Sequence, residues 1–189
     1  MKDQKNVLSI RKLTISAMLL ALGLVLPFLT GQIPRIGNML LPMHIPVFLC
    51  GLICSWQYGA IVGFVLPLLR SALFGAPVMY PMAAAMALEL MTYGLVSGII
   101  YSASRRQGAG AIYRALIAAM LAGRIVWGAA ETVMLGLGGS TFTWKAFMAG
   151  AFLNAIPGIA IQLILIPSIM YALDRIGLVK FRTPETKET

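Results

Sequence analysis

The chain of 189 residues is rich in apolar residues and poor in charge, which excludes an ordinary soluble domain. Hydrophobic residues make up 59% of the chain and charged residues 11%, whereas soluble domains carry roughly 25% charged residues. The formal net charge of +9 would also fit a nucleic-acid-binding protein. The basic residues stand at the ends of apolar runs, however, and form no patch with aromatic residues. We therefore expect an all-α integral membrane protein.

Six apolar runs follow one another along the chain, separated by polar or proline-rich breaks. A membrane-spanning helix needs about 20 apolar residues, with a range of about 17 to 25. The runs cover residues 13–29, 39–54, 58–73, 82–101, 115–137 and 146–173. Only residues 55–57 separate the second run from the third, which predicts a tight hairpin. The expected organisation is a cytoplasmic N-terminal segment at 1–12, a six-helix membrane domain at 13–175 and a cytoplasmic tail at 176–189.

The basic residues predict the orientation of these spans, because Lys and Arg collect in the cytoplasmic connections of membrane proteins. If the N-terminus is inside, eleven basic residues lie on the inside and two on the outside. The eleven are Lys2, Lys5, Arg11, Lys12, Arg105, Arg106, Arg114, Arg175, Lys180, Arg182 and Lys187, and the two are Arg35 and Lys145. Both termini are therefore expected in the cytoplasm.

The strongly polar residues of the spans all lie at mid-depth or in the outer half of the expected bundle. They are His44, Arg70, Glu89, Arg124, Glu131, Asn154 and Gln162. A charged side chain in the bilayer costs about 2.5 to 3.5 kcal/mol even on the mildest scale, so such residues usually face the protein interior and often serve function. This one-sided distribution favours a polar cavity that opens outward. The alternative is a set of interhelical ion pairs without a ligand.

Arg124 and Glu131 lie seven residues apart in the fifth run, so they share one face of a helix. At 1.5 Å per residue they are about 10 Å apart along the axis and cannot pair directly. Glu89, on the fourth run, is a candidate partner for Arg124. Because guanidinium binds a carboxylate through two parallel hydrogen bonds, Arg124 is the first candidate contact for an anionic ligand group and Arg70 the second.

The full set of candidate binding residues includes acceptors and aromatic walls as well. It comprises Arg124, Glu131, Glu89, Asn154, Arg70, Trp127, His44 and Tyr80. The glutamates and the asparagine would hold hydroxyl or amide donors of a ligand. Trp127 could wall the site, although packing is the commoner role of such an aromatic, and His44 is more often a satisfied histidine than a ligand contact. Tyr80 and Arg35 lie in outer connections and could close over the site.

Catalysis and metal binding find little support in the residue types present. Cys50 and Cys54 lie four residues apart in an apolar run, a spacing that fits packing, and a metal site would need more ligands. One histidine and no paired aspartates argue against a small membrane enzyme, so no cofactor or metal is expected. A stand-alone channel or proton-coupled carrier remains an alternative, since buried Glu and Arg suit a proton relay. No duplicated halves support such a carrier.

A pair of small residues in the first run, Ala17 and Ala21, would let another helix approach closely. Six features of the chain together match one known family: this Ala-x-x-x-Ala pair, the length, the six apolar runs, the orientation, the tight hairpin and the stretch LPMHIPVFLCGLICSWQYGAIVGFVLPLLRSALFG (residues 41–75). With these features, over about residues 10–175, the chain resembles the substrate-binding S-components of energy-coupling factor (ECF) vitamin transporters.

The resemblance implies a multi-pass protein of the bacterial cytoplasmic membrane that binds a water-soluble vitamin near its outer face. In that family, the small-residue motif of span one meets a transmembrane coupling subunit, and two ATPase subunits supply energy. This chain has no G-x-x-x-x-G-K-[ST] motif of its own. The S-component would topple in the membrane to release its cargo. Pantothenate is the favoured ligand; pyridoxine-like, niacin-like or folate-like vitamins and a cobalamin or queuosine precursor remain open.

Overall fold

A computed structural model describes residues 2–29, 42–137, 155–179 and 181, and this part of the chain contains helices and no strand. The elements are α1 (Lys2–Leu29), α3 (His44–Cys54), α4 (Trp56–Phe74), the short π-helix η1 (Met79–Ala83), α5 (Ala84–Ala103), α6 (Ala109–Leu137) and α8 (Ile156–Arg175). The expected all-α fold is confirmed.

Five segments of the described chain are long and apolar enough to cross a bilayer. They are Ser9–Phe28, Trp56–Phe74, Met79–Ala103, Ala109–Gly136 and Ile156–Arg175. The sixth apolar helix, α3, has 11 residues. At 1.5 Å per residue it is about 16 Å long, roughly half of the 30 Å hydrocarbon thickness. The second predicted run therefore corresponds to a short helix, and its first residues, 39–41, lie outside the described part.

Two helices begin earlier than the apolar runs that predicted them. Helix α1 begins at Lys2, not at residue 13, and α6 begins at Ala109, not at residue 115, so that Arg114 lies on the helix. Hydropathy indicates where a helix enters the lipid, whereas the helical backbone hydrogen bonds can continue into the polar sequence before that point. The first third of the sixth run, residues 146–154, lies outside the described part.

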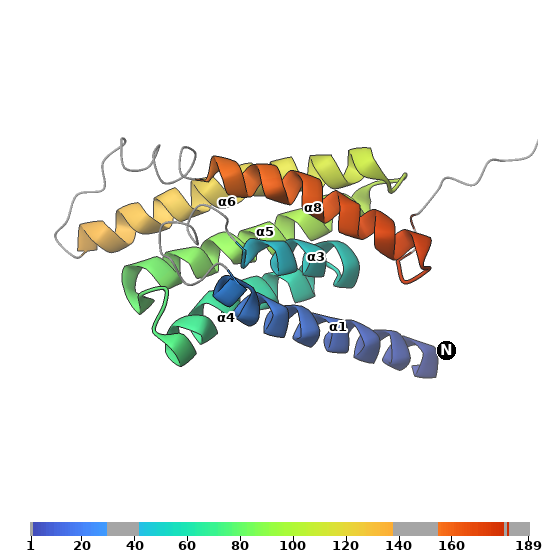
Figure 1. The fold of residues 1–189 in the computed structure, drawn as a ribbon, viewed down its shortest axis with the longest axis horizontal. Helices are drawn as coiled ribbons and strands as arrows, with labels where there is room; N and C mark the ends of the chain where they lie inside the picture. Colours follow the sequence, from blue (N-terminus) through green and yellow to red (C-terminus); the bar gives the residue numbers. More distant parts are fainter. Residues whose placement is uncertain (1, 30–41, 138–154, 180, 182–189) are drawn as a thin grey trace, which may run out of the picture.

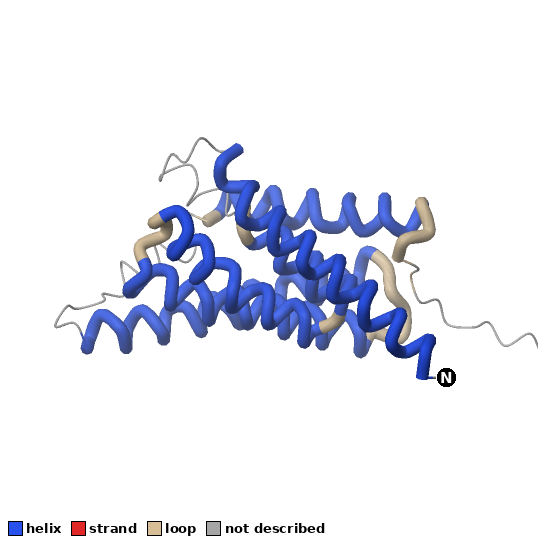
Figure 2. The backbone as a smooth tube through the Cα atoms, turned by 90° about the horizontal axis from the view of Figure 1, so that it is seen from below, coloured by secondary structure: helices blue, strands red, loops and turns tan. Residues whose placement is uncertain are grey.

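The helices form an elongated bundle in which α3 and α5 lie between two flanking pairs (Figure 1). Helices α1 and α4 lie on one side and α6 and α8 on the other, and α5 packs against α3, α4 and α6. The N-terminus and the C-terminal end of α8 lie at the same end of the bundle (Figures 1 and 2). A chain that crosses the membrane six times has both ends on the same side, so this arrangement agrees with the predicted topology.

Helices α4 and α5 approach so closely that glycines line their contact. A Cβ added to Gly94 of α5 would overlap the backbone of Gly59 on α4, and one added to Gly63 would overlap the carbonyl of Leu90. Gly59 and Gly63 are four residues apart, the spacing at which small residues let membrane helices pack backbone to backbone. This contact fixes the position of α5 in the bundle.

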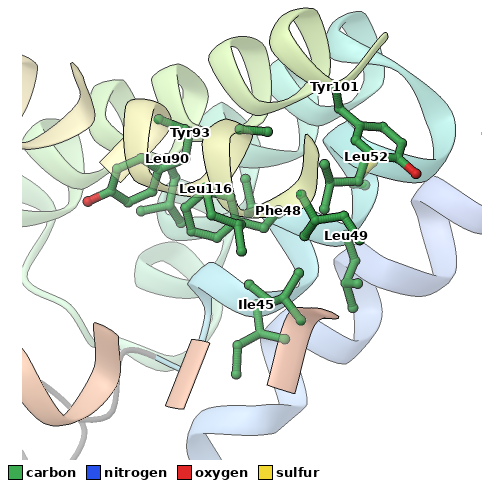
Figure 3. Close-up of a cluster of buried hydrophobic side chains, with 14 of the residues drawn as sticks. Ile45, Phe48, Leu49, Leu52, Leu90, Tyr93, Tyr101 and Leu116 are labelled. Atoms are coloured by element: carbon green, nitrogen blue, oxygen red, sulfur yellow. The ribbon is translucent and has the colours of Figure 1, made fainter. Parts of the chain in front are cut away.

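The α3–α4 hairpin has a single connecting residue, Ser55, which confirms the predicted tight turn. Ser55 has φ 112° and ψ 167°, a conformation that is nearly restricted to glycine. The hairpin places α3 against α5 and α1. Figure 3 shows the resulting core, in which side chains of α3, α5 and α6 gather. The labelled residues are Ile45, Phe48, Leu49, Leu52, Leu90, Tyr93, Tyr101 and Leu116.

Candidate functional site

An ion pair joins α5 and α6 in the interior of the bundle. Nη1 of Arg124 lies 2.8 Å from Oε1 of Glu89, and the two side chains are 8% and 2% exposed. The hydroxyl of Tyr93 donates to the same carboxylate oxygen at 2.7 Å. The predicted pairing of Arg124 with Glu89 is therefore confirmed. The carboxylate receives two donors, which compensate part of the cost of burying its charge.

The position of Tyr93, on α5, depends on neighbours from α3 and α6. Tyr93 lies one turn after Glu89 on α5, and its ring lies against Gly123, where a Cβ would overlap the ring edge. The ring of Phe48 stacks on it at 5.0 Å, and the imidazole of His44 lies 5.3 Å from it. Because Gly123 has no side chain, the phenol can lie directly beside the segment of α6 that carries the guanidinium.

Several buried polar groups of α6 and α8 have unused hydrogen-bonding capacity. Nε of Arg124 and Nε2 of Gln162 are buried and make no hydrogen bond. Glu131 is 6% exposed, and none of the hydrogen bonds or ion pairs among the described residues includes it. A buried donor without an acceptor costs about 1–3 kcal/mol. Such groups are unusual in a native interior and call for an explanation such as a ligand or an ion.

Arg70, the second candidate anion contact, is held by α1. Its Nη1 donates to the carbonyl of Leu24 at 2.8 Å, and its guanidinium lies over the rings of Phe28 at 5.1 Å and Phe74 at 5.7 Å. Pro27 lies inside α1 and lacks the N–H that would bond to the carbonyl of Gly23, directly before Leu24. Arg70 supplies an additional donor to the backbone of this turn. These contacts join α1 to α4 and do not include the Glu89 carboxylate.

The other sequence-predicted site residues lie at different distances from the ion pair. The hydroxyl of Tyr80 donates to the carbonyl of Met134 at 2.5 Å and so ties η1 to the last turns of α6. Tyr80 is 54% exposed, and Trp127 on α6 is half-buried. His44, the first residue of α3, is 1% exposed. Asn154 lies outside the described residues.

Tyr93 was not identified from the sequence. Gln162 was placed at mid-depth from the sequence but was not included among the candidate binding residues. A signal for Tyr93 was present, since it follows Glu89 by four residues and so shares its helix face. The glycine directly before Arg124 was a second signal, because a helix interior without a side chain leaves room for a neighbouring ring. No local pattern singled out Gln162, whose burial depends on how α8 packs.

An open cavity also exists at the cytoplasm-facing end expected for α8, away from the ion pair. Its volume is about 600 Å³, and its lining comes from Ser168, Tyr171, Ala172, Asp174 and Arg175. Asp174 accepts a hydrogen bond from the backbone N–H of Phe181 at 3.0 Å, and the Tyr171 hydroxyl accepts one from Ala109 at 3.1 Å. These polar groups have partners in the chain, so the cavity is a weaker candidate for a ligand site than the buried cluster.

Helix α1 presents a largely uncovered apolar face. Only 11% of its membrane-spanning window is buried inside the protein. Ala17 and Ala21 are both exposed on it. Large apolar side chains surround them, namely Ile10, Leu13, Met18, Leu22 and Val25.

One family model matches most of the chain. Residues 11–170 match the family described as the ECF transporter, substrate-specific component. No curated protein and no solved structure matches the chain. The match covers the six apolar helices and both halves of the buried ion pair. This chain therefore belongs to the family of ECF transporter substrate-specific components and is a multi-pass membrane protein that binds a substrate for an ECF importer.

Proposed function

We propose that this subunit captures a water-soluble vitamin or a related micronutrient at the outer side of the bacterial cytoplasmic membrane. The observation that carries the proposal is the buried polar cluster of Glu89, Arg124 and Glu131. It lies in the half of the bundle that the basic-residue distribution places outermost. Buried charge in lipid is expensive and usually serves function. Tyr80 lies at the same end and would close over the bound molecule.

Two ligand chemistries fit the cluster. A carboxylate vitamin such as pantothenate could bind side-on to Arg124, whose Nε is unused while Nη1 contacts Glu89. A vitamin rich in N–H or O–H donors, such as a pyridoxine-like molecule, could instead bind the carboxylate of Glu131, which has no basic partner among the described residues. The first follows from the preference of guanidinium for carboxylates, and the second from the preference of a carboxylate for donors.

The ligand can be identified directly from purified protein. Protein extracted in detergent would be denatured and the released small molecules identified by mass spectrometry, beside an Arg124→Ala variant. We expect a stoichiometric vitamin in the wild type and its loss in the variant. A wild type that releases nothing and gains no thermal stability from a panel of vitamins would favour a purely structural ion pair.

We further propose that Ala17 and Ala21 dock against a transmembrane coupling subunit that is energised by two ATPases. The uncovered face of α1 supports this proposal, because small residues on an exposed helix face allow close packing by another helix. Ala21→Trp should spare vitamin binding and abolish ATP-dependent uptake. Ala160→Trp, at an exposed alanine of α8, is the matched control and should leave uptake intact. Unchanged uptake in Ala21→Trp would refute the docking role.

A stand-alone carrier makes a different prediction. An ECF subunit should co-purify with the coupling subunit and the ATPases, and proteoliposomes that contain this chain alone should not transport. Uptake that persists without any ATPase would refute the proposal of energised import.

A further inference from the structure

The buried cluster of Glu89, Arg124 and Glu131 holds two carboxylates and one guanidinium, which is a formal net charge of −1. Arg70, Glu89, Arg124 and Glu131 are the buried charged residues of the described chain. Glu89 and Arg124 neutralise each other across 2.8 Å. Arg70 donates to a carbonyl of α1, and its guanidinium lies over the rings of Phe28 and Phe74. Within the described part of the molecule, the carboxylate of Glu131 therefore has no basic partner.

The helix arrangement separates Glu131 from Arg70. Glu131 lies on α6, which packs against α5, α8 and η1, whereas Arg70 joins α4 to α1. Figure 1 shows α1 and α6 on opposite sides of the bundle. Arg124, the buried basic residue on the same helix as Glu131, already contacts Glu89 through its guanidinium.

A second, independent feature points to a ligand in the same interior. Nε of Arg124 and Nε2 of Gln162 are buried donors without acceptors, and their residues are 6% and 1% exposed. They come from α6 and α8, two helices that pack against each other. An occupant that offers carbonyl, hydroxyl or ring-nitrogen acceptors would satisfy them, and an apolar occupant would not.

We infer that the ligand carries no net negative charge, and that it presents an ammonium, amide or hydroxyl donor to Glu131 and neutral acceptors to Arg124 and Gln162. This inference rests on the proposed function and chooses between its two ligand chemistries. An anion placed beside Arg124 would lie close to the Glu89 carboxylate, which Nη1 of the same guanidinium contacts at 2.8 Å, and would share a poorly screened interior with Glu131, where like charges repel. A neutral or cationic ligand avoids that repulsion and supplies the missing partner.

The first test needs no knowledge of the ligand. A buried carboxylate without a partner destabilises the empty protein, so Glu131→Gln should raise the melting temperature of ligand-free protein by several degrees. Asp174→Asn, at an acid that already accepts a hydrogen bond from Phe181, is the control and should not raise it. A lower melting temperature in Glu131→Gln would show that Glu131 has a structural partner and would overturn the inference.

The second test reads the charge of the natural ligand. Small molecules released from wild-type protein would be separated by capillary electrophoresis at pH 7 and identified by mass spectrometry. We expect a neutral or cationic molecule, and at least about a tenfold lower content in Glu131→Gln. A released anion whose content is unchanged in Glu131→Gln would overturn the inference and leave the transport proposal standing. Loss of the coupling subunit from the wild-type preparation would instead count against the transport proposal alone.

Discussion

The two partners of the buried ion pair should differ in how much stability their removal costs. In Glu89→Gln the guanidinium of Arg124, 2.8 Å from the substituted group, stays charged, because arginine does not lose its proton in proteins. Removing one partner of a buried pair costs about 3–5 kcal/mol. In Arg124→Met the carboxyl of Glu89 keeps the Tyr93 hydrogen bond and can bind a proton. We expect a loss of about 1.5–3 kcal/mol there, as for a hydrogen bond to a charged group.

The double variant Glu89→Gln, Arg124→Met separates this explanation from simple packing loss. Without an unpaired charge, it should be more stable than Glu89→Gln alone, and the coupling energy between the two sites should reach about 2–3 kcal/mol. Equilibrium unfolding of ligand-free protein in mixed micelles would measure all four proteins under the same conditions. A double variant whose loss equals the sum of the two single losses would refute the reasoning, as would a cost below about 1 kcal/mol for Glu89→Gln.

Three further variants test the helix packing by the same unfolding assay. Gly94→Ala should cost more than about 3 kcal/mol or prevent folding, because its Cβ would overlap the backbone of Gly59. Gly136→Ala, in open space on α6, should instead stabilise the protein by up to about 1 kcal/mol. Equal effects of the two substitutions would contradict the close α4–α5 contact. Arg70→Gln should cost about 1–3 kcal/mol through the lost bond to the α1 carbonyl and the lost ring contacts, and no loss would contradict its role. Ser55→Gly should stabilise by about 1 kcal/mol, since glycine adopts this backbone conformation without strain, and a destabilised hairpin would count against it.

Much of the fold was predictable because hydropathy acts locally. The apolar runs, the α3–α4 hairpin and the pairing of Glu89 with Arg124 were all expected from composition, spacing and depth. The starts of α1 and α6 were not, because a helix can extend beyond the bilayer into sequence such as Lys2–Lys12 without any change in its hydrogen bonding. The short length of α3 was not predicted either, since a run of apolar residues does not reveal where within it the helix begins.

The candidate site was predictable in part. Depth alone grouped Glu89, Arg124 and Glu131, because the cost of burying charge in lipid is independent of the fold. Depth could not separate Arg70 from them, although its guanidinium contacts α1 and its own helix. Neither could it identify Tyr93, whose role depends on the space above Gly123.

The amino-acid sequence by itself determined that this protein lies in a lipid bilayer, how many apolar helices it has, and at which depth in the bilayer its buried charges lie. These properties depend on transfer free energies, which each residue carries wherever the chain goes. The tertiary structure alone decided which charges meet. Glycine contacts between α4 and α5 and the ring of Tyr93 against α6 fix the rotation of the helices, and that rotation neutralises Glu89 with Arg124 while it leaves Glu131 without a basic partner in the described chain.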